Sequence, residues 1–287
     1  MSKVITVMNM KGGVGKTTVA LNLGAGIAQY RLGRDRRVLL IDYDPQFNLS
    51  QALLEPATYF SLEKQRKTCL AILQDDASQV DPFTIQVPGN HTPPHPATVT
   101  HRVVSYRGGT YLDIVPSTLE LMYLALGNSS GKLHVFEERF AKFIASCRPL
   151  YDLILIDCHP AGSILTRTSL RSSDHVLIPV APQPYALRGI GLMLKFIAAS
   201  QIGGQGPIPH ILFNAVPRHE ISDEEAQVRQ SKELAPYCLA ATLKKLKAFS
   251  EPMGGQGFVW ANTKPYSGEA KTNLLAVMNE VITRCTL

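Results

Sequence analysis

Short apolar runs alternate along the chain with segments in which apolar residues recur every three or four positions. The runs lack apolar–polar alternation, so they predict strands that are buried on both faces. Predicted strands cover residues 4–8, 37–42, 112–115, 151–157, 176–180 and 211–213. Predicted helices cover residues 18–30, 136–146, 191–200, 223–234 and 273–283. Strands that alternate with helices predict an α/β fold, with a doubly wound, mainly parallel sheet flanked by helices.

A proline-rich stretch interrupts this alternation. Between residues 82 and 109 the chain contains Pro82, Pro88, Pro93, Pro94 and Pro96. We therefore expect one domain over residues 1–287, with an irregular, surface-exposed insertion at about 82–109. Three histidines fall in this insertion and are expected to be solvated rather than to bind a metal: His91, His95 and His101.

Composition narrows the classes of protein. The apolar share is 45%, which excludes a wholly disordered, collagen-like or coiled-coil chain. Lys and Arg number 29 against 23 Asp and Glu, and this net charge of +6 favours a polyanionic partner. The five cysteines are far apart with no Cys-x-x-Cys pair, which predicts a reducing cytoplasm and no zinc or iron–sulfur cradle.

A glycine-rich segment, MKGGVGKTT at 10–18, lies between the first predicted strand and the first predicted helix. This is the context that a phosphate loop requires, because glycines let backbone N–H groups turn toward phosphates at a helix N-terminus. Lys16 is expected to reach the β- and γ-phosphates of ATP, and the Thr17 hydroxyl to ligate Mg²⁺. The predicted fold is therefore of P-loop NTPase type. The predicted nucleotide-binding residues of the loop are Lys11, Gly12, Gly13, Val14, Gly15, Lys16, Thr17 and Thr18.

The loop departs from the usual phosphate-loop pattern at its start. Met10 occupies the position of the first glycine, and Lys11 follows it. Lys11 lies too far round the loop to duplicate Lys16. We expect it to cross to the nucleotide of a second subunit and to neutralise charge there as an arginine finger does. This predicts a face-to-face homodimer with ATP between the subunits, and a catalytic role for Lys11 and Lys16.

Three acidic residues follow predicted strands. Asp42 and Asp44 come at the end of the second strand, and Asp157 ends the strand at 151–157. Because carboxyl ends of parallel strands meet at the ligand edge of a sheet, we assign Asp157 to Mg²⁺, directly or through a water. Asp44 is the candidate to orient or deprotonate the attacking water, and Asp42 to support Lys16 or the metal shell. The alternative for each is that it caps the following helix.

Three segments carry a family resemblance: KGGVGKTT at 11–18, LLIDYDPQ at 39–46 and YDLILID at 151–157. Together they resemble the deviant Walker A ATPases of the ParA/MinD group, and most of all the ParA-type partition ATPases. The segments LDIVPSTLEL at 112–121, VLIPVAPQPYALRGI at 176–190 and SGEAKTNLLAVMNEVI at 267–282 are similar to further family elements. The resemblance covers most of the chain apart from about 55–110.

The resemblance implies an ATP-dependent homodimer that binds double-stranded DNA without sequence preference. It implies slow hydrolysis of ATP to ADP, stimulated by a ParB-type centromere-binding partner that releases the dimer from DNA. Lys11 resembles the signature lysine of the family, and Asp44 its catalytic acid. Asn214, which follows the strand at 211–213, matches an asparagine that the group often places beside adenine. The implied localisation is cytoplasmic and nucleoid-associated.

Two departures from the family pattern concern residues near the predicted site. Phe47 replaces the usual glycine after Pro-Gln, and we expect it to resist a positive φ and to alter a switch loop. Cys158 and His159 follow Asp157, but no third group that would orient a Cys–His nucleophile is found, so both are assigned structural roles.

Basic clusters provide candidate DNA contacts, because phosphate contacts give affinity without reading sequence. The clusters contain Arg31, Arg34, Arg36 and Arg37; Arg167 and Arg171; and Lys244, Lys245 and Lys247. We favour the third cluster, with Arg218 as a weaker candidate. No spacing shows that these side chains converge.

Other functions stay open at this point. A MinD-like membrane-associated switch would need a basic amphipathic C-terminal helix, whereas the apolar face of 273–287 is typical of packing against a sheet, so no membrane partner is expected. An electron carrier resembling the nitrogenase iron protein would need cysteines that bridge a cluster between subunits, and only Cys158 follows a predicted nucleotide strand. A scaffold that uses ATP only to dimerise, or an ATPase for positioning or conjugative transfer, also fits the motifs.

Overall fold

The computed structural model describes residues 2–30, 36–75, 92–126, 133–159, 162–201, 206–250, 252–261 and 263–287. Five residues with sequence predictions, Arg31, Arg34, Pro82, Pro88 and His91, lie outside this described part, as does the first third of the proposed insertion.

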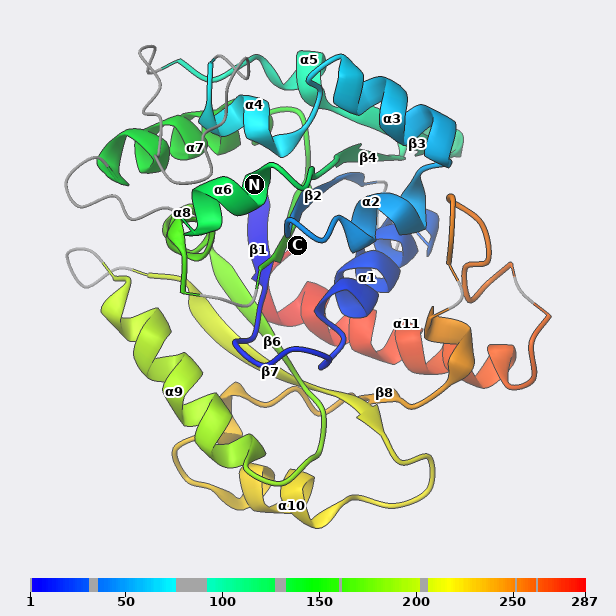
Figure 1. Cartoon of the computed structure of the whole chain (residues 1–287). Coiled ribbons are helices and arrows are strands. Elements are labelled where there is room, and N and C mark those ends of the chain that lie inside the picture. The colour runs from blue at the N-terminus through cyan, green and yellow to red at the C-terminus, as the bar shows by residue number, and fades with distance from the viewer. Residues whose placement is uncertain are drawn as a thin grey trace.

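One sheet organises the described residues, with the strand order β3-β4-β2-β5-β1-β6-β7-β8 (Figure 1). The strands are β1 (Lys3–Val7), β2 (Arg37–Tyr43), β3 (His101–Ser105), β4 (Tyr111–Val115), β5 (Leu153–Cys158), β6 (His175–Val180), β7 (Ile208–Val216) and β8 (Leu243–Lys244). Only β3 pairs antiparallel, with β4, and every other pairing is parallel. The predicted fold class, a mainly parallel α/β sheet, is confirmed.

The central strands are buried along their whole length, because helices cover both faces of the sheet. Every position of β5 and of β6 is buried, which explains why their sequences are apolar without alternation. Only β3, at the edge, alternates between half-buried and exposed positions.

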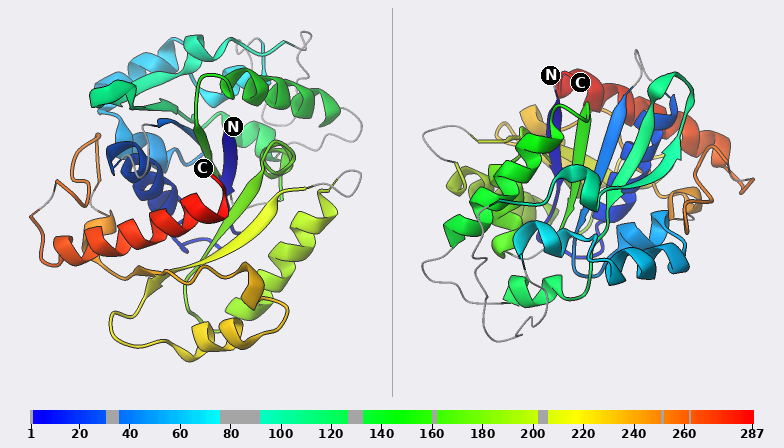
Figure 2. Two further views of the ribbon diagram at one scale, coloured as in Figure 1. Left: turned by 180° about the vertical axis from the view of Figure 1, so that it is seen from behind. Right: turned by 90° about the horizontal axis from the view of Figure 1, so that it is seen from above.

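Helices pack on the two faces of the sheet (Figure 2). They are α1 (Lys16–Tyr30), α2 (Asn48–Leu53), α3 (Pro56–Lys64), α4 (Cys69–Leu73), α5 (Pro96–Val99), α6 (Leu121–Leu126), α7 (Leu133–Cys147), α8 (Ile164–Arg171), α9 (Ala186–Ala199), α10 (Asp223–Gln230) and α11 (Ser267–Arg284). The core on one face is formed with α1, α2 and α11, and the core on the other with α4, α6, α7, α8 and α9.

Two glycines let α1 approach its neighbours closely. A Cβ on Gly24 would lie 2.6 Å from Cδ2 of Leu40 on β2, and one on Gly26 would lie 2.7 Å from Sδ of Met278 on α11. The helix α1 therefore packs closely against the sheet on one side and against α11 on the other. Since α1 begins at Lys16, this packing fixes the place of the preceding loop.

The described part of the proposed insertion is more regular than predicted. His95 precedes the short helix α5, and its Nδ1 accepts a hydrogen bond from the amide of Ala97 at 3.2 Å. β3 then adds the antiparallel edge strand beside β4. His95 and His101 thus belong to a capped turn and to a strand.

The C-terminal helix packs as its pattern predicts. Leu274, Val277, Met278 and Val281 of α11 are buried in the core that α1 shares. None of the described helices has both the length and the apolar composition needed to cross a membrane.

Candidate nucleotide site

The glycine-rich loop joins the end of β1 to the start of α1, as predicted. Gly13 and Gly15 have φ values of 73° and 84°, a region that residues with a Cβ rarely adopt. Asn9 holds the start of the loop, because its Nδ2 donates to the carbonyl of Pro179 on β6 at 2.8 Å. Its Oδ1 accepts from the amide of Lys11 at 3.0 Å. The start of the loop is thus attached to β6, a neighbour of β1 in the sheet.

Asn214 lies beneath this loop. From the family resemblance we expected this residue to lie beside the adenine of the nucleotide. Its Nδ2 donates to the carbonyl of Val14 at 2.8 Å, and a Cβ on Gly15 would lie 2.2 Å from the same nitrogen. Glycine is therefore required at position 15 for two reasons: its φ is positive, and a Cβ there would clash with Asn214. Sequence spacing carries no sign of the contact, because the two residues it joins are 200 positions apart.

Three carboxylates and one lysine meet at the carboxyl edge of the sheet. Asp42 and Asp157 are direct neighbours on the parallel strands β2 and β5. Both are buried, with exposed fractions of 0% and 1%, and Lys16 is 8% exposed. Asp44 follows β2 and is also buried. The predicted convergence of these acids at one edge is therefore present.

Asp157 has a free, buried carboxylate oxygen. Its Oδ2 has no hydrogen-bond partner among the described residues, although the Thr17 hydroxyl bonds to the same carboxyl group. Burial raises the pKa of Asp157 to about 7, and the charge of Asp44 adds to this, while Thr17 and Lys16 oppose it. An orphaned carboxylate oxygen beside a threonine hydroxyl is a donor set that suits Mg²⁺, so these residues fit the predicted metal.

The contacts of Asp42 match the alternative that it caps the following helix. Its Oδ2 accepts bonds from the amide and the hydroxyl of Ser50, at 2.7 and 2.6 Å. Ser50 Oγ in turn accepts from the amide of Ser117 at 3.0 Å. Burial raises the pKa of Asp42 well above its ordinary value, with Asp157 as the next cause. These contacts make Asp42 the anchor of α2 and leave Asp157 as the acid facing the phosphate loop.

Asp44 and Lys11 lie at the outer part of the site. Asp44 Oδ1 accepts from the amide of Gln46 at 3.0 Å, which ties it to the turn that follows β2. Lys11 is exposed, and its Nζ donates to Oε1 of Gln183 at 2.6 Å. This bond joins Lys11 to the segment that follows β6.

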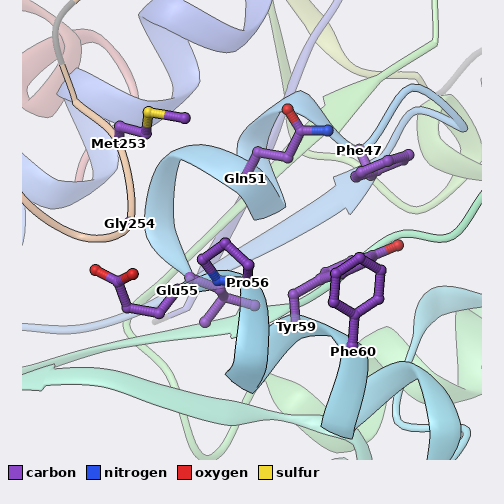
Figure 3. A pocket seen from close by; sticks show the side chains of 9 residues that line it. Phe47, Gln51, Glu55, Pro56, Tyr59, Phe60, Met253 and Gly254 are labelled. Atoms are coloured by element: carbon purple, nitrogen blue, oxygen red, sulfur yellow. The ribbon is translucent and has the colours of Figure 1, made fainter.

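Phe47 adopts the backbone conformation that we expected it to resist. Its φ is 43°, in the left-handed region, at the residue before α2. The ring stacks on Tyr59, with centroids 5.1 Å apart and an interplanar angle of 12°. Phe47 and Tyr59 line a mainly apolar pocket of about 680 Å³ together with Phe60, Pro56 and Met253, and Figure 3 shows Met253 on the side of this pocket opposite the two rings. The Phe47 ring is thus packed against Tyr59 while the Phe47 backbone has a positive φ, which is usually found at glycine.

The cysteines of the described residues are all free and buried. Cys158 is completely buried, and its Sγ lies 3.3 Å from Ser169 Oγ. Burial raises its pKa to about 12, so the thiol is protonated at neutral pH and unreactive. Its burial gives no support to a cluster held between subunits.

Ion pairs change the picture of the basic clusters. Lys244 Nζ and Arg218 Nη2 bind the two oxygens of the same carboxylate, Glu269, at 3.1 and 2.5 Å. The remaining lysines of that cluster, Lys245 and Lys247, are exposed. Two of the four residues favoured as DNA contacts, Lys244 and Arg218, therefore lie close together, but both bind a carboxylate of the protein itself.

The other two basic clusters are engaged with the protein in the described residues. Arg36 is buried and donates to the carbonyl of Leu287, and Arg37 pairs with Asp152 at 3.1 Å. Arg167 and Arg171 both pair with Glu137.

A family model described as an AAA domain matches residues 2–203. Over 205 residues the chain is 32% identical to the sporulation initiation inhibitor protein Soj of Bacillus subtilis, covering 70% of this chain and 67% of Soj. It is 30% identical over 205 residues to the chromosome-partitioning ATPase Soj of Treponema pallidum, covering 71% and 66%. The chain is a ParA-type ATPase of this family. The resemblance carried by its loop and its two strand-end motifs is thereby confirmed.

Solved structures show that this ParA-type ATPase has the expected P-loop fold. A plasmid partition protein of Borrelia burgdorferi bound to AMPPNP matches with a TM-score of 0.69 and 20% identity, covering 99% of this chain and 100% of that one. Cobyrinic acid a,c-diamide synthase of Mycobacterium smegmatis, with ADP and magnesium, gives 0.68 and 21%, covering 100% and 97%. The pNOB8 ParA bound to nonspecific DNA gives 0.63 and 20%, covering 99% and 98%.

Proposed function

We propose that this ParA-type ATPase is a DNA-partition ATPase whose ATP-bound homodimer grips DNA without sequence preference. Hydrolysis to ADP, stimulated by a ParB-type partner, then releases it. The observation that carries the proposal is that the loop contains two lysines in different surroundings. Lys16 is buried and Lys11 is exposed, in a chain related to Soj. The first serves the chain's own nucleotide, and the second is available to another subunit.

The phosphate loop and the acids support binding of ATP with Mg²⁺. Gly13 and Gly15 open the backbone toward the phosphates, and Lys16 supplies a fixed positive charge at the helix start. Thr17 and Asp157 would hold Mg²⁺, which neutralises phosphate charge when bound. Two structural neighbours were solved with AMPPNP, or with ADP and magnesium, and this also supports the assignment.

Asp44 is the residue that we assign to the attacking water. It lies in the turn after β2, and its second oxygen, Oδ2, stays available while Oδ1 accepts from Gln46. A carboxylate at this place accepts a proton from, or orients, a water aimed at the terminal phosphate. Lys16 then stabilises the charge that develops on the phosphate oxygens.

The face around Lys11 supports dimerisation. Lys11 contacts Gln183, and two apolar side chains follow Gln183 on the same segment. Tyr185 is 85% exposed and Leu187 is 43% exposed. Exposed apolar side chains beside a lysine are suited to burial against a second copy, with Lys11 released from Gln183 to reach the partner's nucleotide.

Two observations support the proposed DNA binding: exposed lysines on this chain, and a protein of the same fold that was solved with DNA. Lys245 and Lys247 are exposed at the segment after β8, and a dimer would present each of them twice. The pNOB8 ParA, which shares the fold, was solved with nonspecific DNA. Doubling the phosphate contacts by dimerisation would couple the nucleotide state to DNA affinity.

Retention of the protein on nonspecific DNA tests the proposal. We expect retention with ATP and Mg²⁺, and its loss with ADP, in the Lys16→Ala variant and in the Lys11→Ala variant. The Lys11→Ala variant should still bind nucleotide, because Lys11 is outside its own phosphate site. Retention that is equal with ATP, ADP and no nucleotide would refute the switch.

Turnover separates an ATPase from a scaffold that uses ATP only to dimerise. Asp44→Ala should lower ATP hydrolysis by roughly 10²-fold or more while light scattering still detects an ATP-dependent dimer. Unchanged turnover in this variant would favour the scaffold. Unchanged particle mass of the wild type with a nonhydrolysable ATP analogue would overturn the dimer itself.

A further inference from the structure

A cluster of two histidines and one cysteine lies at the opposite edge of the sheet from the phosphate loop. His175 begins β6, His210 is near the start of β7, and Cys285 follows the last turn of α11. The phosphate loop follows the carboxyl end of β1, whereas this cluster lies where the parallel strands begin. Figures 1 and 2 show the C-terminus beside the N-terminus at this edge.

The three side chains are buried and face one another. His175, His210 and Cys285 are 4%, 6% and 2% exposed. Their ligand atoms all lie within 4.8 Å of one another. Nδ1 of His175 and Nε2 of His210 are 3.1 Å apart. In a tetrahedral zinc site with Zn–N near 2.05 Å, two nitrogen ligands are separated by about 3.3 Å, so the imidazoles already have nearly this spacing.

The outer ring nitrogens show what the pair lacks. Nδ1 of His210 is buried without a hydrogen-bond partner among the described residues, whereas the His175 ring also has a hydrogen bond with the backbone of Cys285. If one proton bridges the inner nitrogens, Nδ1 of His210 is left without a partner, either as a lone pair or as an N–H group. If both rings carry the proton outside, two lone pairs face each other across 3.1 Å. A cation between the inner nitrogens removes that repulsion.

We propose that His175, His210 and Cys285 form a binding site for a thiophilic transition-metal ion of the Zn²⁺ class. Two imidazoles and a thiolate are ligands that Zn²⁺, Co²⁺ and Cu⁺ prefer, whereas Mg²⁺ prefers oxygen. The site is therefore chemically distinct from the Mg²⁺ site that we propose at Asp157. A tetrahedral ion would take its fourth ligand from solvent.

Binding of the ion would release the proton of the Cys285 thiol, because the thiolate is the form that ligates a metal.

Charged groups of both signs surround the cluster. Lys3 and Arg284 oppose a cation, and Asp174 and Glu280 favour one. Arg284 and Glu280 pair with each other at 3.0 Å, which leaves their combined effect small. A thiolate from Cys285 adds a further negative charge next to the ion.

Such an ion would cross-link the end of α11 to β6 and β7. It would add to the stability of the fold and leave the nucleotide edge untouched, so ATP turnover should be independent of it. This inference does not rest on the proposed partition function.

Co²⁺ titration of the nucleotide-free, chelator-treated full chain tests the site. We expect one equivalent to bind with a thiolate-to-cobalt charge-transfer band and the intense visible bands of a tetrahedral ion, and Zn²⁺ to displace it. Cys285→Ser should abolish the charge-transfer band and weaken binding by at least about tenfold, since even the loss of an outer-shell group costs that much. His210→Gln should weaken binding similarly while it keeps all the thiols.

Cys238→Ser is the matched control, because Cys238 is also buried but lies outside the cluster. It should keep the charge-transfer band and the rise in melting temperature that Zn²⁺ produces in the wild type. No charge-transfer band in the wild type, or a band that survives Cys285→Ser and His210→Gln, would overturn the proposal. The wild-type spectrum decides the matter even if one variant fails to fold.

Discussion

At the residue scale, Asp157 shows how burial sets the chemistry of the site. Its carboxyl group is 1% exposed, and burial is the largest cause that raises its pKa to about 7, compared with 3.8 for a solvated aspartate. The folded protein therefore holds a proton here that the unfolded chain gives up at lower pH. A bound cation would replace that proton.

The pH dependence of stability follows from this difference. Below about pH 4 the group is protonated in both states, and as the pH rises toward 7 only the unfolded chain ionises freely, so stability falls. In the nucleotide- and metal-free protein, Asp157→Asn should remove this loss and raise the free energy of unfolding at pH 8 by on the order of 2–4 kcal/mol. Urea denaturation from pH 4 to pH 8 measures it.

Asp223→Asn is the control for this experiment, because Asp223 is exposed at the start of α10. It makes the same change of side chain at the surface, so it shows the effect of replacing a carboxyl group by an amide without burial. Parallel stability curves for Asp157→Asn and the wild type would contradict the assignment of a raised pKa to this residue.

Phe47 allows a second prediction at this scale, about backbone strain. Phe47→Ala loses the stack on Tyr59 but keeps a side chain at a φ of 43°, whereas Phe47→Gly loses the stack and relieves the strain. We expect the glycine variant to be more stable than the alanine variant by about 1 kcal/mol. Thermal and urea unfolding of the two variants measure the difference, and a more stable alanine variant would show that no strain is present.

At the element scale, the long periodic segments were predictable and the short ones were not. The predicted strands at 4–8 and 37–42 and the predicted helix at 18–30 correspond to β1, β2 and α1, with ends shifted by a few residues. Short helices such as α4 and α8 were not predicted. They have too few residues for a periodic signal, and packing against the sheet stabilises them instead.

The fit of α1 against the sheet leads to a prediction about two helical glycines. Gly24→Ala should destabilise the protein by about 1–2 kcal/mol, because crowding against Leu40 outweighs the better helix propensity of alanine. Gly189→Ala in α9 is the matched change, and nothing lies within 4 Å of its added Cβ. It should stabilise the protein by about 0.5–1 kcal/mol. Chemical denaturation of the nucleotide-free protein compares them, and equal effects would contradict the packing argument.

At the scale of the whole molecule, charge is distributed differently from what a count of lysines and arginines indicates. Glu269 engages both Lys244 and Arg218, and the Arg218 side chain also lies over the ring of Tyr266. The bond from Arg218 is the first cause that lowers the pKa of Glu269, so the carboxylate stays charged at neutral pH. Lys245 and Lys247 are more exposed than Lys244, and this exposure makes them the better candidates for DNA.

The salt dependence of DNA binding tests this ranking. In an ATP-bound dimer, Lys245→Ala or Lys247→Ala removes two phosphate contacts and should reduce the slope of log K against log salt by about 2. Glu269→Gln frees Lys244 and Arg218 and should strengthen binding to DNA. Fluorescence anisotropy at several salt concentrations measures the slopes. A slope unchanged in both lysine variants would place the DNA surface elsewhere.

Local order along the chain by itself determined the phosphate loop, the buried strands and the acids at their ends. Each of these depends on neighbours within a few residues, so covalent spacing is enough to specify them. Folding brings Asn214 under the loop, places Glu269 between two basic residues and brings His175 next to His210 and Cys285. Those contacts join residues that are far apart in the chain, and the order in which strands assemble into the sheet determines which of them meet.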